Sequence, residues 1–263
     1  MERAYYSAQI EDFVHASVEA VLGELADNNQ FALEITQKNA WKQQIELLQR
    51  LLPTYSGKIY FEYSIPRMGR RIDVLLFIQG VIFVLEFKVG ERTFHRQSID
   101  QVWDYALDLK NFHETSHGLL IAPILVATRA KQASIHIGLT PHNDNMLYPI
   151  LSSAQSLPDV IAKVLALPKG QTMGVEAWEK GRYLPTPTIV EAAMALYQGH
   201  SVEDISRKDA DAINLGKTTD AIAEAIRQAR IRRQKCICFV TGVPGAGKTL
   251  VGLNIANQHM DKA

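Results

Sequence analysis

Residues 72–88 read IDVLLFIQGVIFVLEFK and predict a β-hairpin of two strands that carry very few polar side chains. Gln79-Gly80 fits a two-residue turn between them, because glycine tolerates the positive φ that tight hairpin turns require. This turn pairs Ile78 with Val81. Each further pair lies one residue back on the first strand and one residue forward on the second, so the turn sets the register of the whole hairpin.

Three charged side chains then share one face of this apolar hairpin. Asp73 lies opposite Glu86, and Lys88 projects on the same side as Glu86. Two neighbouring carboxylates repel each other, and burial raises the cost of ionising both, whereas Mg²⁺ accepts one or two carboxylates and keeps several waters. On spacing alone, a metal site with a catalytic lysine and a buried salt bridge are equally good interpretations. A three-residue turn would place the two carboxylates on opposite faces.

The next segment predicts a helix over residues 98–112, with apolar residues at helical spacing. Gln101 and Tyr105 are four residues apart and therefore share a face of this helix. Taken without the hairpin, that face would be an ordinary solvated one.

Hairpin and helix together resemble the PD-(D/E)XK nuclease superfamily, in particular its RecB-like branch with a Q-x-x-x-Y helix. The resemblance rests on Ile72-Asp73, Glu86-Phe87-Lys88 and Gln101-Val-Trp-Asp-Tyr105. Ile72 stands where the family usually has proline, which we regard as a harmless substitution.

The resemblance implies a catalytic set made of Asp73, Glu86, Lys88, Gln101 and Tyr105. Asp73 and Glu86, with the backbone carbonyl of Phe87, would bind Mg²⁺ or Mn²⁺. Lys88 would assist the attacking water, and the last two residues of the set would face the active site and nucleic acid. The family's first acidic position is not resolved: Glu46 and Glu62 are candidates, and for each a solvated face is the favoured interpretation.

A second motif begins after the apolar run KCICFVT at residues 235–241, which predicts a strand. The following GVPGAGKT fits G-x-x-x-x-G-K-[ST], the phosphate-binding loop of P-loop NTPases, with the helix expected after it. The predicted ATP-binding residues are Gly242, Gly245, Gly247, Lys248 and Thr249. Lys248 would reach the β and γ phosphates, and the hydroxyl of Thr249 would bind Mg²⁺.

Only 14 residues follow Thr249 in the 263-residue chain, so we expect an incomplete ATPase that belongs to a longer protein. No second strand follows to supply the acidic residue that usually holds Mg²⁺. The segments FEYSIPRMGRRIDV and FVTGVPGAGKTLVGLNIA resemble a bacterial group of nuclease-ATPase proteins, whose P-loop part is similar to the helicase-like region of group 3 Schlafen proteins.

We predict an α/β protein: a restriction-endonuclease-like mixed sheet flanked by helices, followed by the first strand and helix of a P-loop NTPase fold. The expected strands are residues 59–63, 72–78, 81–88 and 119–127, and the helix over 98–112 crosses between the last two. Pro123 within the last strand indicates an edge or a bulge.

The sequence predicts two domains joined by a linker. Residues 1–167 would form the nuclease-like domain, the proline- and glycine-rich residues 168–187 a linker, and residues 188–263 the incomplete N-terminal part of a P-loop helicase-like domain.

Composition fits a cytoplasmic protein. No apolar run reaches the length of a membrane span, and the N-terminus lacks the apolar region of a signal peptide, so no membrane partner is expected. Cys236 and Cys238, in the predicted strand, would be buried thiols. Lys and Arg total 28 and so do Asp and Glu, so a broad electrostatic nucleic-acid binder is disfavoured. Within PRMGRR, however, Arg67, Arg70 and Arg71 precede Asp73 and are interpreted as phosphate contacts.

His113-Glu114-Thr115-Ser116-His117 matches the zinc-protease pattern H-E-x-x-H. That motif works only within a helix, and Thr115 and Ser116 instead signal a helix end. We interpret the two histidines as charged caps of the helix C-terminus.

The sequence therefore predicts a Mg²⁺- or Mn²⁺-dependent nuclease that acts on phosphodiester bonds, coupled in a longer protein to a helicase-like ATPase. DNA is a more probable substrate than RNA, and the oligomeric state is not predicted. The alternative is a catalytically inactive nuclease-like module that binds nucleic acid and regulates the ATPase.

Overall fold

The computed structural model describes residues 3–29, 35–65, 70–131, 135–141, 144–168, 172–183, 209–241 and 248–260. The chain divides into two compact units, Met1–Tyr183 and Leu184–Ala263, here named unit 1 and unit 2. No helix among these described residues is both long and apolar enough to cross a membrane.

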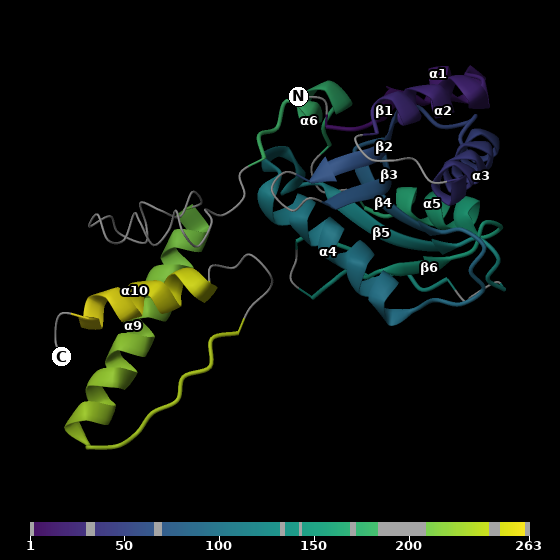
Figure 1. The fold of residues 1–263 in the computed structure, drawn as a ribbon. Helices are drawn as coiled ribbons and strands as arrows, with labels where there is room; N and C mark the ends of the chain where they lie inside the picture. The colour runs from purple at the N-terminus through teal and green to yellow at the C-terminus, as the bar shows by residue number, and fades with distance from the viewer. Residues whose placement is uncertain are drawn as a thin grey trace. The chain divides into compact units, whose positions relative to one another are not determined.

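A six-stranded mixed sheet forms the centre of unit 1 (Figure 1). In spatial order the strands are β1 (Tyr6–Gln9), β2 (Gly57–Ile65), β3 (Arg70–Ile78), β4 (Val81–Lys88), β5 (Leu120–Ala127) and β6 (Ile150–Ser152). Strands β1 to β4 pair antiparallel, whereas β4, β5 and β6 pair parallel. The four predicted strands are confirmed within two residues at each end, and β1 is an addition that the sequence reasoning missed.

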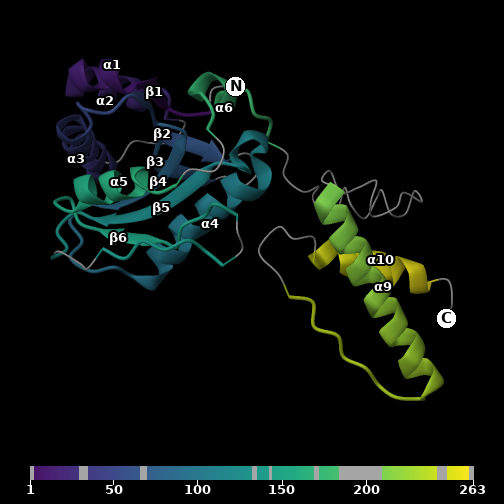
Figure 2. The same ribbon diagram turned by 180° about the vertical axis from the view of Figure 1, so that it is seen from behind.

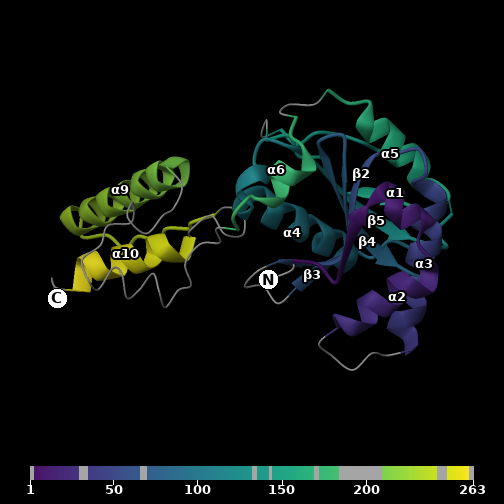
Figure 3. The same ribbon diagram turned by 90° about the horizontal axis from the view of Figure 1, so that it is seen from above.

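Helices cover both faces of this sheet, as Figure 3 shows along its edge and Figure 2 from behind. One face carries α1 (Ile10–His15), α2 (Val18–Asp27), α3 (Ile35–Leu51) and α5 (Leu157–Leu165). The other carries α4 (Arg96–Phe112) and, after the short 3₁₀ helix η1 (Glu114–Ser116), α6 (Val175–Glu179). We call them the α3 face and the α4 face. The order α3-β2-β3-β4-α4-β5 is the α-β-β-β-α-β order expected from the sequence.

The predicted hairpin register is confirmed. Gln79 and Gly80 have φ values of 51° and 78°, as a type I′ turn requires. Ile78 pairs with Val81, and the ladder continues in this register to the pair of Val74 and Leu85, where β3 leaves β4. The turn therefore has two residues rather than three.

Pro123 lies in a central strand, because β5 is paired on both sides, but it coincides with a bulge. Towards β6, Ile121 forms a bridge with Met146, whereas Ile124 pairs with Ile150. The neighbouring segment thus has one residue more than β5 across this interval, which spares a ladder bond that proline could not donate. Of the two expectations, the bulge is confirmed and the edge is wrong.

Part of the expected linker is packed onto unit 1. Trp178 of α6 is fully buried on the α4 face, with ring-centroid distances of 5.6, 5.9 and 5.4 Å to Tyr60, Tyr63 and Phe77. The division between the two units falls after Tyr183, inside the residues expected to be a linker.

Unit 2 contains α9 (Asp209–Ile231) and α10 (Lys248–Met260), which pack against each other. The strand predicted over residues 235–241 is not formed, and Ile237 and Phe239 are 80% and 87% exposed. Cys236 and Cys238 are exposed as well, which corrects the prediction of buried thiols. The physical reason is that a strand needs neighbours, and the described part of unit 2 offers no second strand for pairing.

A buried polar network closes the end of α4. Arg3 donates a hydrogen bond to Nε2 of His113 at 2.9 Å and another to the carbonyl of Gly181 at 2.8 Å. Since arginine can only donate, Nε2 of His113 is the acceptor, and Nδ1 carries the proton and donates to Oγ of Ser116 at 2.7 Å. Ser116 Oγ also accepts from Nε1 of Trp178 at 2.8 Å.

This network corrects the interpretation of His113 as a charged cap. Burial, and then the positive charge of Arg3, lower the pKa of His113 to about 4. His117 does contact the helix end, through Nδ1 and the carbonyl of Lys110. Helix α4 ends at Phe112, so the two histidines of the H-E-x-x-H pattern do not share a helix.

We predict that replacing His113 by glutamine flattens the loss of stability in acid. Above pH 6.5 the imidazole is neutral in both states and contributes no pH dependence. Between pH 6.5 and 4 the unfolded chain takes up a proton that folded His113 does not, so the free energy of unfolding falls by up to about 3 kcal/mol. Urea denaturation of both proteins across this pH range measures the difference.

The exposed His15 provides the matched control. The variant His15→Gln should retain the full acid dependence. If His113→Gln retains it too, His113 is protonated in the folded protein and the proposed tautomer is wrong.

Candidate active site

The site forms where β3 separates from β4. Their ladder ends at Val74 and Leu85, although β2 and β3 stay paired to the start of β3. At this point the side chain of Asp73 replaces the missing strand, because Oδ2 accepts the backbone N–H of Phe87 at 2.8 Å. The β3–β4 ladder therefore ends at a group of polar side chains within an otherwise apolar sheet.

Two carboxylates lie in this group. Glu86 is 2% exposed, and its Oε1 accepts a hydrogen bond from Nζ of Lys88 at 2.7 Å. Its other oxygen, Oε2, is buried and has no hydrogen-bond partner in the described protein. Shielding from water, and then the charge of Glu86, raise the pKa of Asp73 well above its usual range. Burial also raises the pKa of Glu86, against the opposing effect of Lys88.

Helix α4 supplies the polar groups that hold the lysine. Nζ of Lys88 lies 3.4 Å from Oε1 of Gln101, and Nε2 of Gln101 donates to the hydroxyl of Tyr105 at 2.9 Å. Lys88 keeps 30% of its side chain exposed, whereas Tyr105 is buried. The structure thus brings together Asp73, Glu86, Lys88, Gln101 and Tyr105, while their catalytic roles remain predictions.

The groups present fit a hard divalent cation better than zinc. An all-oxygen set is available from Asp73, the partnerless Oε2 of Glu86 and the backbone at Phe87. Mg²⁺ and Mn²⁺ accept such a set and complete it with water. In the described ranges no three side chains of His, Cys, Asp or Glu are grouped to hold a metal, as a structural zinc site would need.

Glu62 of β2 lies at the position opposite Asp73 of β3, between the ladder pairs Phe61–Val74 and Tyr63–Ile72. It is not on a solvated face, which corrects the favoured interpretation. Its Oε1 accepts from Nε1 of Trp41 at 2.9 Å, and its Oε2 accepts from Nε of Arg71 at 3.0 Å. Its charge raises the pKa of both site carboxyls.

Glu46, the other candidate, has a different environment. It lies on the exposed side of α3, 3.9 Å from Lys42. Of the two candidates for the first acidic position, only Glu62 interacts electrostatically with the site.

The backbone of Glu62 is left-handed, with a φ of 53° in mid-strand. Side chains change face at this point without any change of register. In β2, Tyr60 and Tyr63 both contact the α4 face although they are three residues apart, and in β3 the same holds for Ile72 and Leu75. A left-handed residue costs a non-glycine side chain about 1–2 kcal/mol, so the surrounding contacts must impose it.

Arg71 has a local partner rather than a free guanidinium. Besides its ion pair with Glu62, it stacks over the ring of Tyr5 at 4.6 Å. Arg67 and the side chain of Arg70 lie outside the described residues. The interpretation of Arg71 as a phosphate contact stays a prediction, and its guanidinium already has partners within the protein.

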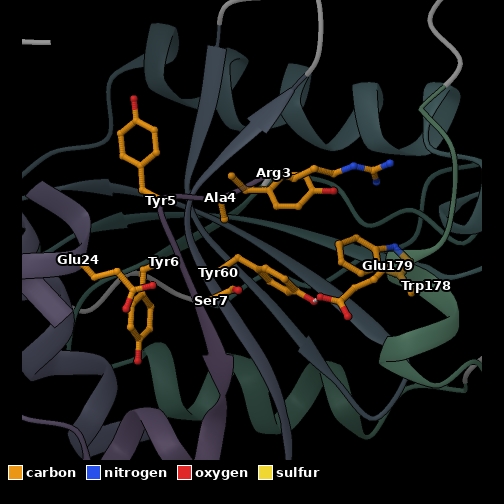
Figure 4. Close-up of a pocket in the computed structure, with 10 residues that line it drawn as sticks. Arg3, Ala4, Tyr5, Tyr6, Ser7, Glu24, Tyr60, Trp178 and Glu179 are labelled. Carbon is orange, nitrogen blue, oxygen red and sulfur yellow. Dashed lines mark hydrogen bonds between the residues drawn. The ribbon is translucent and has the colours of Figure 1, made fainter. Parts of the chain in front are cut away.

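A separate cavity of about 270 Å³ lies beside β1 (Figure 4). It is bounded by the N-terminal segment and α6, and Glu179 accepts hydrogen bonds there from Tyr60 and Lys58. None of the five predicted catalytic residues lines it. The candidate site, between the central strands β3 and β4, is therefore separate from this cavity.

Only part of the phosphate-binding loop is described. Lys248 and Thr249 are the first two residues of α10, as the motif predicts for a helix that starts at the lysine. Gly242, Gly245 and Gly247 lie outside the described residues. ATP binding by this segment stays a prediction.

We predict that Glu62→Gly is more stable than Glu62→Ala by about 1 kcal/mol, because glycine adopts a positive φ freely and alanine does not. At an ordinary strand position the order is reversed. Ser64 of the same strand provides that reference, since we expect Ser64→Ala to have a higher free energy of unfolding than Ser64→Gly. Urea denaturation of the four variants measures both differences. Alanine superior to glycine at both positions would show that Glu62 is not left-handed.

Residues 235–263, at the end of unit 2, match a family model described as Schlafen group 3, DNA/RNA helicase domain. No curated protein and no solved structure is significantly similar to the chain. The nuclease family that unit 1 resembles in sequence is matched in none of these comparisons, so the candidate site rests on its own geometry.

Proposed function

We propose that unit 1 is a Mg²⁺- or Mn²⁺-dependent nuclease that hydrolyses phosphodiester bonds of nucleic acid, DNA in preference to RNA. One observation carries the proposal: a buried carboxylate oxygen, Oε2 of Glu86, has no hydrogen-bond partner beside a second carboxyl, Asp73. A buried anion without a partner is costly, and an ion pair with Lys88 alone satisfies only Oε1.

Each residue of the site then has a defined task. Asp73 and Glu86 would hold the metal, together with the carbonyl of Phe87. When bound, the metal would stabilise charge on the phosphate and lower the pKa of a coordinated water. Lys88 is fixed between Glu86 and α4, so its ammonium can orient the attacking water or stabilise the developing phosphate charge.

Helix α4 positions that ammonium. Gln101 accepts from Lys88 through Oε1, and Tyr105 fixes the amide by accepting from Nε2. This chain of hydrogen bonds sets the amide orientation, because Lys88 can only donate. The two α4 residues would also face the nucleic acid.

For unit 2 we propose ATP binding by the helix start at Lys248 and Thr249. The match of residues 235–263 to a Schlafen group 3 helicase domain supports a nucleic-acid-related ATPase. A helix N-terminus such as that of α10 favours phosphate through the positive end of its dipole.

Cleavage by the purified 263-residue protein tests the nuclease. Labelled single- and double-stranded DNA and RNA are incubated with Mg²⁺ or Mn²⁺. We expect cutting that depends on metal and falls by roughly 100-fold or more in Asp73→Asn and in Lys88→Gln. Asp159→Asn, at an exposed carboxylate of α5, is the matched control and should cut like the wild type.

Calorimetric titration with Mn²⁺ separates the possible failures. Metal binding that Asp73→Asn abolishes, without cleavage of any substrate, would favour the binding module that regulates the ATPase. Absence of both metal binding and cleavage would overturn the proposal and leave Glu86 and Lys88 as a structural ion pair.

A further inference from the structure

Two loops lie side by side at the carboxyl ends of the parallel strands β4 and β5: residues 89–95 and residues 128–131. The backbone N–H of Thr128 donates to the carbonyl of Lys88 at 3.2 Å. The hydroxyl of Thr128 accepts from the N–H of Gly90 at 2.8 Å. The second loop is thus attached directly to the candidate catalytic lysine.

A third bond completes this attachment, since the N–H of Arg129 donates to the carbonyl of Glu91 at 2.9 Å. Parallel pairing of Lys88 with Ala127 holds the starts of both loops in step. The backbones of these two loops are therefore held to each other by hydrogen bonds.

Positive charge gathers on these loops. Four exposed cations, here named the basic ridge, are Arg92, Arg96, Arg129 and Lys131. Two acids lie nearby: Glu91 is 3.8 Å from His95, which forms an ion pair only when the histidine is protonated, and Asp100 is 3.9 Å from Arg96.

The remaining cations, Arg92, Arg129 and Lys131, form no ion pair within the described ranges. A chain with 28 basic and 28 acidic residues thus carries more basic than acidic side chains at this end of its sheet. Three such cations on a fixed backbone suit a polyanion with regularly spaced charges better than a single small anion.

We propose that the basic ridge binds the phosphate backbone of the nucleic acid whose scissile phosphate lies at the candidate site. This inference rests on the proposed function, and it assigns the substrate-holding surface that function requires. The carboxylates of Asp73 and Glu86 repel a phosphate, so attraction must come from neighbouring groups. Arg71 is engaged with Glu62 and Tyr5, whereas the ridge adjoins Lys88.

The salt dependence of binding tests this surface. Fluorescence anisotropy with a labelled single-stranded and a duplex DNA, in a chelator to prevent cutting, gives the affinity between about 50 and 200 mM salt. We expect the double variant Arg92→Gln/Arg129→Gln to bind more weakly and to lower the slope of log K against log salt by about 2.

Two controls separate charge from fold. Arg92→Lys/Arg129→Lys should restore most of the slope, because a phosphate contact needs the charge more than the guanidinium shape. Lys163→Gln, at an exposed lysine in the last turn of α5, should leave affinity and slope unchanged.

The same variants in the metal-dependent cleavage assay distinguish this inference from the nuclease. We expect a raised KM and a nearly unchanged kcat for the double glutamine variant. Cleavage with unchanged KM and unchanged salt slope would overturn the ridge and leave the nuclease standing. Ridge-dependent binding without any cleavage would overturn the nuclease while the ridge remains a binding surface. No binding by the wild type at low salt would overturn the ridge outright.

Discussion

The tight turn at Gln79-Gly80 constrains everything that follows in unit 1. Because both residues have positive φ, β3 and β4 leave the turn as directly paired strands, and the pairing fixes which side chains share a face. Glu86 and Lys88 consequently project from the α4 face, where helix α4 provides Gln101 and Tyr105. A different loop length would separate the acids without changing a single charged residue.

The β3–β4 ladder ends where two buried carboxyls come into electrostatic conflict. A regular ladder would continue from Val74 and Leu85 to a pair of Asp73 with Glu86. Instead β3 departs with β2, and the carboxyl of Asp73 accepts the N–H that the departing strand leaves without a bond. The left-handed Glu62 lies at the matching position of β2, so both strands of the ribbon bend together. The end of the β3–β4 ladder and the left-handed backbone of Glu62 therefore belong to one distortion of the sheet.

Much of this arrangement follows from sequence patterns, and the remainder fails for identifiable reasons. Alternation and turn chemistry gave the hairpin, and helical spacing gave α4, so the five site residues could be assembled in advance. Glu62 was named as a candidate, but the solvated face favoured for it was wrong, because period-two reasoning assumes a regular backbone and a positive φ at a glutamate leaves no mark in the sequence. The basic ridge escaped because Arg92 and Arg129 meet only through parallel pairing of β4 with β5. The strand at residues 235–241 failed since pairing depends on partners and not on propensity.

Arg3 reaches across to the carbonyl of Gly181, and Tyr183 forms a β-bridge with His113. The two ends of unit 1 are therefore fastened to each other and to the end of α4. A force applied to the chain beyond Tyr183 would act first on these few contacts, and they would break one after another. The ladders of β2, β3 and β4 do not include these contacts, so such a force would reach the strand residues Asp73, Glu86 and Lys88 only after the contacts had broken.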